Sequence, residues 1–380
     1  MIEFKLPFLG ADVDQGKLLE WRIRPGDTVR RGQVVAVVDT SKAAVDVEIW
    51  QEGTVVELLA QPGATVPVGA VLATLLEAGK TADSTTNAIA AAPLQALPAV
   101  AARRRVSPAA RKHAQDHGID IAGVVGTGPQ GAVTLQDVQQ LEARAQPQAA
   151  AAAASAAADK QSAMRRAIAA AMSRSKREIP HYYLNETVPM RKALNWLAAA
   201  NEKRSITERL LMPVLQLKAV AMALKKHPDM NGFYLNDAHR PSRTIHVGVA
   251  ISLRQGGLIA PAIHDVAEKS LDQLMRDLSD LVRRARAGSL RSSEMSDPTI
   301  TVTNLGEQGV EAVYGVIYPP QVALLGFGRA REIPWARDGA LLVMPAMTAS
   351  LAADHRVSDG HSGALFLAEV REWLQRPEQL

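Results

Sequence analysis

The chain of 380 residues contains no cysteine, which excludes disulfide bonds, thiolate metal ligands and a cysteine nucleophile. Any sulfur chemistry must therefore arrive on a cofactor or a substrate. No apolar run approaches the roughly 20 residues that are needed to span a bilayer. The first residues, Met-Ile-Glu-Phe-Lys-Leu-Pro, also lack the pattern of a secretory signal. We therefore expect a cytoplasmic protein that does not enter a membrane.

Neither sign of charge dominates, and aromatic residues make up only 4% of the chain. With 43 basic and 39 acidic residues, the charge gives no reason to expect nucleic acid as a partner. The sequence pI of 9.3 nevertheless allows contact with acidic protein surfaces. A chain of this length exceeds one ordinary core, so we expect two or three domains.

Two stretches of low complexity divide the chain. Residues 79–102 and 142–160 are rich in alanine; the first stretch also contains two prolines, and the second has Pro147 near its start. Such composition is typical of linkers. The first stretch could span on the order of 80 Å at roughly 3.3 Å per residue; the second could also be partly helical, because alanine is the best helix former. The predicted domains are residues 1–78, 103–141 and 161–380.

The first domain contains an internal repeat. Residues of the same type recur at a constant offset of 37 positions: Gly16, Glu20, Pro25, Gly26, Thr28, Val29, Gly32, Val34 and Ala36 match Gly53, Glu57, Pro62, Gly63, Thr65, Val66, Gly69, Val71 and Ala73. Pro-Gly-x-Thr-Val indicates a turn that leads into a strand. Two copies of such a unit predict two similar sheets packed face to face in an all-β flattened barrel.

Lys42 lies between the two repeats, at the tip of a predicted hairpin. An apolar run precedes it at positions 34–38, and apolar and acidic residues alternate after it from Val45 to Ile49. Most lysines are ordinary solvated surface residues. A lysine at the tip of a hairpin that joins two symmetric halves is, however, displayed to other proteins. This position makes Lys42 a candidate modification site.

The middle domain is predicted to contain two short helices around a glycine-rich loop. Ser107 is a natural N-cap with Pro108 at the first helical position, Gly118 is a natural stop, and Thr134 caps a second helix. Two short helices enclose little core, so a binding module is favoured over an enzyme. His113 and His117 are expected to be exposed helix residues.

The third domain mixes helical and strand patterns. Helical periodicity covers residues 162–176 and 207–227, and strands are expected at 245–252, 299–302 and 322–326. These patterns predict an α/β sandwich with a mixed sheet. His355 lies in Ala353-Asp354-His355-Arg356-Val357-Ser358-Asp359-Gly360, where the local sequence offers too few ligands for a metal. We expect no metal site.

These motifs together resemble the dihydrolipoamide acyltransferases of 2-oxo acid or acetoin dehydrogenase complexes. The resemblance rests on Ser41-Lys42-Ala43, on the block of residues 104–141, on His355-x-x-x-Asp359-Gly360 and on the segments Ile179-Pro-His-Tyr-Tyr-Leu, Gly257-Leu-Ile-Ala-Pro, Thr303-Asn-Leu-Gly306 and Pro319-Pro-Gln-Val-Ala-Leu-Leu-Gly326. It covers nearly the whole chain. It implies a lipoyl domain, a peripheral subunit-binding domain and a catalytic domain similar to chloramphenicol acetyltransferase. Biotin carriers share the first fold, but they resemble Met-Lys-Met around the lysine.

The resemblance also assigns roles to residues. It implies lipoic acid on Lys42, coenzyme A as substrate, His355 as general base, and Thr303 as the hydroxyl that stabilises the oxyanion. Thiols are only slightly ionised at neutral pH, and an imidazole is well suited to take up their proton. By the same resemblance Asp359 is a structural residue that pairs with an arginine, for which Arg165 is the candidate.

Partners follow from the resemblance as well. The middle domain would bind the decarboxylase component or dihydrolipoamide dehydrogenase through basic residues: Arg103, Arg104, Arg105, Arg111 and Lys112. The catalytic domain would form trimers with active sites between subunits, assembled into a core of 24 or 60 copies. Acetyl transfer is expected, with branched-chain acyl transfer as the alternative. A non-catalytic scaffold subunit is a second alternative, against which the presence of His355 argues.

Overall fold

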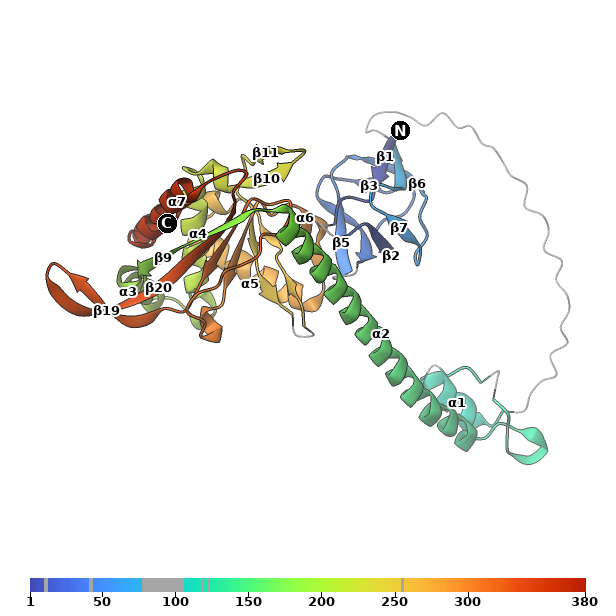
Figure 1. Ribbon diagram of the computed structural model, residues 1–380. Helices are drawn as coiled ribbons and strands as arrows, with labels where there is room; N and C mark the ends of the chain where they lie inside the picture. Colours follow the sequence, from blue (N-terminus) through green and yellow to red (C-terminus); the bar gives the residue numbers. More distant parts are fainter. Residues whose placement is uncertain (10–12, 41–43, 77–105, 118, 122–123, 254–255) are drawn as a thin grey trace. The chain divides into compact units, whose positions relative to one another are not determined.

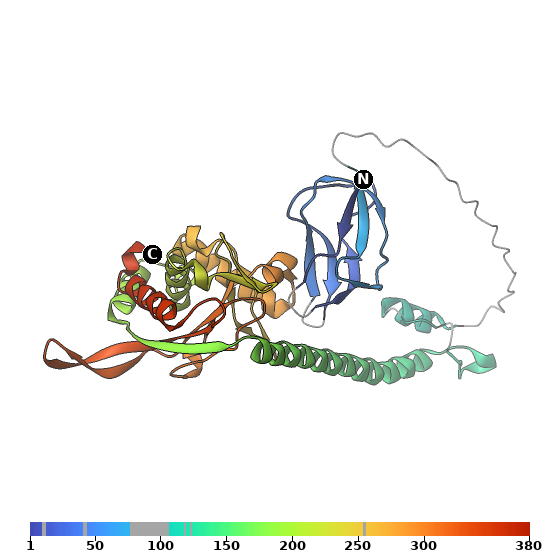
Figure 2. The same cartoon turned by 45° about the horizontal axis from the view of Figure 1, so that its top comes forward.

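A computed structural model describes residues 1–9, 13–40, 44–76, 106–117, 119–121, 124–253 and 256–380. The chain divides into two compact units, Met1–Lys80 with Gln161–Leu380, and Thr81–Lys160. Figures 1 and 2 show an all-β domain near the N-terminus, a module that contains helix α1, and a large α/β domain at the C-terminus. None of the helices in the described residues is long and apolar enough to cross a membrane.

The N-terminal domain consists of two antiparallel sheets. One has the order β1-β8-β6-β3, and the other contains β5-β4-β2-β7. The strands are β1 (Ile2–Lys5), β2 (Gln15–Trp21), β3 (Thr28–Val29), β4 (Gln33–Asp39), β5 (Ala44–Ile49), β6 (Gly53–Leu58), β7 (Thr65–Pro67) and β8 (Val71–Leu76). Alternate residues from both sheets, including Leu18, Val35, Val47, Leu72 and Leu75, meet in one buried core. The predicted flattened barrel is confirmed.

The structure reproduces the 37-residue repeat in its backbone geometry. Gly26 and Gly63 have φ of 95° and 94°, a region that strongly favours glycine. Their N–H groups donate to Val55 O at 2.8 Å and Leu18 O at 2.7 Å, two acceptors that are themselves 37 residues apart. The repeat therefore encodes an approximate two-fold symmetry, with each turn docking on the other half.

The middle module begins with helix α1 (Pro108–Asp116), whose N-cap Ser107 accepts a hydrogen bond from Ala110 N. A 3₁₀ turn η1 (Pro129–Gly131) precedes helix α2. Five buried residues form the core of the middle module: Ala110, Ala114, Val124, Val133 and Val138. Such a small core is consistent with a binding module. Gly118, expected to stop α1, lies outside the described residues.

Helix α2 extends over Leu135–Glu178 and so includes the alanine-rich residues 142–160. The helical alternative for this stretch thus applies, in keeping with the high helix propensity of alanine. The limits proposed above for the domains and linkers stay predictions, and residues 77–105 lie outside the described part of the chain.

The C-terminal domain is built on a mixed sheet of seven strands. Its order is β15-β12-β17-β18-β20-β19, and β9 also pairs with β20. Strands β12, β17 and β18 are parallel, whereas β20 is antiparallel to β18, β9 and β19. The strands are β9 (His181–Pro189), β12 (Val247–Val249), β15 (Ala262–Ile263), β17 (Ile300–Asn304), β18 (Ala323–Phe327), β19 (Arg331–Arg337) and β20 (Ala340–Asp354).

Helices cover one face of this sheet, as α4 and α7 show in Figures 1 and 2. They and the sheet share one apolar core that includes Leu217, Leu274, Leu325, Leu351 and Phe366. The helices are α3 (Arg191–Glu202), α4 (Met212–Leu224), α5 (Leu271–Ala287), α6 (Ser292–Ser296) and α7 (Gly360–Leu374). Smaller strands are β10 (Gly232–Leu235), β11 (Ala238–Pro241), β13 (Ile251–Ser252), β14 (Leu258–Ile259) and β16 (Leu290–Arg291).

The elements expected from the sequence match this domain with shifted ends. The helix predicted at 207–227 is shorter, because residues 206–208 form a separate 3₁₀ turn and Pro213 stands in the first turn of α4. The strand predicted at 245–252 is divided into β12 and β13. The long β19–β20 hairpin closes at Asp338 and Gly339, both at positive φ, as a two-residue turn requires.

Candidate active site

His355 follows the last residue of β20 and begins the turn that leads to α7. Its backbone N–H donates to Pro180 O at 2.9 Å, which joins this turn to the start of β9. The ring is exposed and stands edge-on to Tyr182, with 5.2 Å between ring centroids. Within the described residues its two ring nitrogens make no hydrogen bond. They are therefore available to a substrate.

A dense polar network fixes the turn around His355. Asp354 is fully buried and accepts from Arg356 Nε at 2.9 Å and from an Arg356 terminal nitrogen at 2.7 Å. The Arg356 guanidinium also lies over the Tyr234 ring, 3.9 Å from its centroid. On the other side of the turn, the Tyr182 hydroxyl and Ser358 Oγ are 2.8 Å apart. The exposed imidazole thus stands on a rigid support.

Thr303 occupies the penultimate position of β17 and is half-buried. Its neighbour Asn304 is held in place, donating to Gln216 Oε1 at 2.6 Å and accepting from Gly306 N at 2.9 Å. In the described part of the chain, the Thr303 hydroxyl has no hydrogen-bond partner. A hydroxyl that donates to nothing in the protein is free to donate to a substrate oxygen.

The fold does not bring His355 and Thr303 of one chain together. Thr303 lies in register with Gly326, and Gly326 with Ser350, two strands across the sheet. His355 lies five residues beyond Ser350. At about 3.3 Å per residue and 4.8 Å per strand, the two backbones are separated by roughly 19 Å. A base and an oxyanion donor that act on one thioester must both lie about 3 Å from the reacting atoms.

Asp359 orders the end of the motif, but not in the predicted way. Its carboxylate caps α7 and accepts from Ser362 N at 3.0 Å. This backbone hydrogen bond is the main reason that the pKa of Asp359 is lowered. The pair with Arg165 expected from the sequence is not formed within the described residues of the chain. The reason is that Asp359 stands where α7 begins, and the first backbone N–H groups of α7 need an acceptor.

His181 has a structural role. Its Nε2 accepts from Ile317 N at 3.1 Å, so its Nδ1 carries the proton and donates to Ile179 O at 2.8 Å. Burial is the largest cause of the lowered pKa of this group. A neutral ring that is bonded on both sides cannot act as a base.

The residues that support His355 were not predicted from the sequence. Tyr182 and Arg356 both lie in motifs that carry the family resemblance, but their contacts with the turn around His355 were not expected. Their residue types indicate a possible network, whereas the partners become visible only when β9 pairs with β20 and brings Tyr182 opposite Ala353.

The hairpin of Lys42 forms as predicted around it. Strands β4 and β5 pair up to Asp39 and Ala44, which leaves four residues for the tip. Lys42 itself lies outside the described residues. The paired hairpin ends fit the display of a covalently attached arm.

Three family models match the chain. Residues 2–75 match the model described as biotin-requiring enzyme, residues 104–139 match the e3 binding domain, and residues 154–380 match the catalytic domain of the 2-oxoacid dehydrogenases acyltransferase. A fold with a lipoyl-bearing domain, a binding module and an acyltransferase domain defines a multidomain acyl carrier and transferase. Because the third model covers more than half of the chain, the protein belongs to the 2-oxoacid dehydrogenase acyltransferase family, whose members transfer an acyl group from a lipoyl arm to coenzyme A.

Relatives match over the full length. The acetyltransferase component of a pyruvate dehydrogenase complex from Staphylococcus aureus is 30% identical, with 100% of this chain and 98% of the relative covered. The acetyltransferase component of an acetoin cleaving system from Bacillus subtilis is 28% identical, with 100% and 99% covered. Both are named as acting on a dihydrolipoyllysine residue, which agrees with lipoic acid and disfavours the biotin alternative.

Solved structures match the catalytic domain. The cubic core of a pyruvate dehydrogenase multienzyme complex is 28% identical with a TM-score of 0.53, covering 56% of this chain and 88% of the other. An acetyltransferase from Azotobacter vinelandii, studied for the catalytic roles of one serine, one histidine and one asparagine, matches with the same values. Together with the three family models, these matches confirm the predicted fold class.

Proposed function

We propose that this protein transfers an acetyl group from a dihydrolipoyl arm on Lys42 to coenzyme A. The observation that carries the proposal is the full-length similarity to acetyltransferase components of pyruvate and acetoin systems. Branched-chain acyl groups are the alternative, because a few methylenes change the transition-state energy by only about 1–3 kcal/mol.

The residues of this chain would act as follows. When bound, the lipoyl arm supplies the acyl group as a thioester. The His355 imidazole accepts the proton of the coenzyme A thiol as its sulfur forms a bond with the carbonyl carbon. The Thr303 hydroxyl donates to the carbonyl oxygen while negative charge develops there. As the bond to the departing sulfur breaks, the His355 imidazolium returns its proton to that sulfur.

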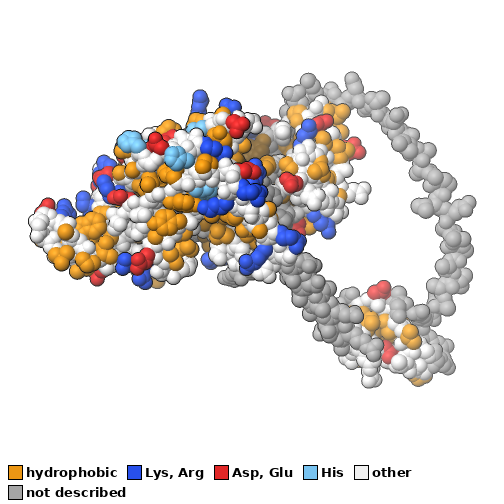
Figure 3. Space-filling model, viewed as in Figure 1, with side chains coloured by type: hydrophobic (Ala, Val, Ile, Leu, Met, Phe, Trp, Pro, Cys, Tyr) orange, Lys and Arg blue, Asp and Glu red, His pale blue; other side chains and the backbone are white. Residues whose placement is uncertain are grey.

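The complete site would combine His355 of one copy with Thr303 of another. The separation of roughly 19 Å within one chain supports this arrangement, as does the exposed ring of His355. Figure 3 also shows hydrophobic side chains gathered on the β19–β20 hairpin, where Leu341 is 78% and Val343 56% exposed. Exposed apolar surface of this kind is typical of protein contacts. We infer trimers, assembled into a core of 24 or 60 copies, as in the cubic core of the related complex.

The middle module would bind the other enzymes of the complex. The match to the e3 binding domain supports dihydrolipoamide dehydrogenase as a partner, and the decarboxylase component is the second candidate. Arg111 and Lys112 are exposed on α1 and offer positive charge, whereas residues 103–105 lie outside the described part. Binding through these groups should weaken with rising salt, mainly through the association rate. The expected cytoplasmic location is retained as part of this proposal.

Two experiments test the proposal. The intact mass of the protein from a lipoate-competent host should show one lipoyl group, absent from Lys42→Arg; a group that persists in this variant would contradict the assignment of Lys42. Reconstituted complexes should then be assayed with pyruvate, acetoin and branched 2-oxo acids. A preference for branched 2-oxo acids would show that the protein transfers branched-chain acyl groups rather than acetyl groups.

A further inference from the structure

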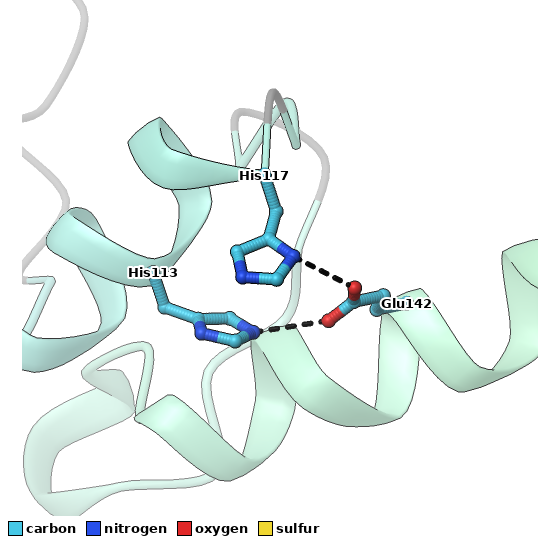
Figure 4. Close-up of side chains that lie close together, drawn as sticks. All are labelled: His113, His117 and Glu142. Carbon is cyan, nitrogen blue, oxygen red and sulfur yellow. Dashed lines mark hydrogen bonds and ion pairs between the residues drawn. The ribbon is translucent and has the colours of Figure 1, made fainter.

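Three side chains of the middle module converge on one point. His113 lies in the last turn of α1, and His117, four residues further on, is the C-cap residue of this helix, so the two side chains lie on the same side of the helix end. Glu142, on the second turn of α2, reaches both of them, as Figure 4 shows. Glu142 Oε2 lies 3.0 Å from His113 Nε2, and Oε1 lies 3.0 Å from His117 Nδ1.

We propose that His113, His117 and Glu142 form a binding site for a divalent transition metal of the Zn²⁺ type. Two imidazoles and one carboxylate are a ligand set that suits this ion, with water as the fourth ligand. One nitrogen or oxygen atom from each side chain lies within 4.8 Å of those of the other two. The site is unrelated to the acyl transfer proposed above.

The distances fit coordination with small side-chain rotations. Bonds of about 2.05 Å in a tetrahedral site place neighbouring ligand atoms roughly 3.3 Å apart. The two N···O distances of 3.0 Å are already close to this value. The remaining adjustment falls on the two rings, which are stacked with centroids 4.3 Å apart.

The surroundings keep the ligands accessible. The side chains of His113, His117 and Glu142 are 22%, 48% and 26% exposed, so an ion has a path from solvent and room for a water ligand. The hydrogen bond from His113 is the largest cause of the lowered pKa of Glu142. Metal binding requires an ionised carboxylate, which is the ordinary form of a glutamate at neutral pH.

The module has a structural use for such a crosslink. Its core consists of five small or medium apolar residues, and a chain without cysteine cannot add a disulfide. Small domains of this kind commonly gain stability from a structural metal. Elsewhere in the module, Asp137 of α2 accepts hydrogen bonds from Thr127 Oγ1 and from the backbone N–H of Thr134, which joins the loop to α2. An ion on the His113–His117–Glu142 site would join α1 to α2.

A second pair of histidines shows what distinguishes this site. His246 and His264 in the catalytic domain have ring centroids 4.8 Å apart. Each of them, however, lies near a different carboxylate. His246 Nδ1 is 3.6 Å from Asp265 Oδ1, and His264 Nε2 is 3.0 Å from Asp297 Oδ2. Over the described ranges of the chain, only His113, His117 and Glu142 bring three ligand atoms together in the way a metal needs.

The test is a calorimetric titration of the full-length chain with Zn²⁺. The chain should lack a polyhistidine tag and carry Lys42→Arg, so that neither a tag nor a dithiol competes for the ion. We expect one Zn²⁺ per chain and no binding of Mg²⁺. Glu142→Gln keeps an oxygen that can accept hydrogen bonds from the imidazoles but removes the charged ligand, and His117→Gln removes an exposed ligand. Each should weaken Zn²⁺ binding at least about tenfold.

Asp116→Asn is the matched control, because it removes an exposed carboxylate from the same helix without touching the site. It should bind Zn²⁺ as the parent does. Zn²⁺ should also slow amide hydrogen exchange in α1 of the parent but not of Glu142→Gln. Absence of Zn²⁺ binding in the parent, or binding by Glu142→Gln and His117→Gln that is as tight as in the parent, would overturn the proposal and leave a hydrogen-bonded cluster.

Discussion

His355 and Thr303 stand toward opposite ends of one sheet, and their surroundings differ. His355 projects from a turn that is held by the Asp354–Arg356 pair and by the contact between Tyr182 and Ser358. Thr303 belongs to a regular strand. The neighbouring Asn304 is held by a hydrogen bond to Gln216, whereas the Thr303 hydroxyl has no hydrogen-bond partner among the described residues. In the proposed mechanism, each end would supply what the other lacks, a base or an oxyanion donor. A single chain would then contain two half-sites, one around His355 and one around Thr303.

The largest effect is expected at the base. His355→Ala should lower the rate of acyl transfer by roughly 10²–10⁴-fold, because no other group would take up the thiol proton. The assay is transfer between acetyl-coenzyme A and dihydrolipoamide, with native mass analysis to verify assembly. His361→Ala, in the next turn, is the control and should stay close to the parent. Undiminished activity of His355→Ala would show that His355 is not the base.

The oxyanion donor should come next. Thr303→Val keeps the shape of the side chain but removes the hydroxyl, and should lower kcat by roughly 10²–10³-fold. Thr303→Ser retains a hydroxyl and should keep most of the activity. If the valine and serine variants lost activity equally, packing on β17 rather than hydrogen bonding would explain the loss.

Part of the fold and of the candidate site could be predicted from the sequence alone. Turn glycines, alternation and the 37-residue repeat predicted the N-terminal barrel, because each is a local pattern that determines local backbone geometry. The motif around His355 was likewise recognised as a local sequence pattern. The ends of α4, the division of the strand at 245–252 and the cap formed by Asp359 were not, since they depend on which segments become neighbours. The approach of Glu142 to His113, across 29 residues, was invisible for the same reason.

A smaller effect is expected for the support of His355. Arg356→Leu leaves the buried Asp354 carboxylate without its partner and should destabilise the catalytic domain by about 3 kcal/mol. Denaturant unfolding measures this change. The double variant Asp354→Asn with Arg356→Leu removes the buried charge and should recover part of the loss. No recovery would mean that the contact of Arg356 with Tyr234 matters more than the ion pair.

The smallest effect concerns the cap of α7. Because the pKa of Asp359 is lowered in the folded state, its carboxylate stabilises the fold above the ordinary pKa of about 3.9, and this stability is lost as the pH falls below it. Asp359→Asn keeps a capping side chain but removes this acid dependence. Thermal unfolding at pH 7 and near pH 3 should show a smaller difference for Asp359→Asn than for the parent. An identical difference would exclude Asp359 as a contributor.

Co-assembly of two inactive chains tests the division of the site between copies. His355→Ala and Thr303→Val should be coexpressed in equal amounts, with mixed trimers verified by native mass analysis. If each site takes its base from one copy and its hydroxyl from the next, about one quarter of the sites in random trimers are intact. We therefore expect activity near one quarter of that of the parent. Activity that stays at the level of the single variants, with mixed trimers present, would contradict a site that is shared between two copies.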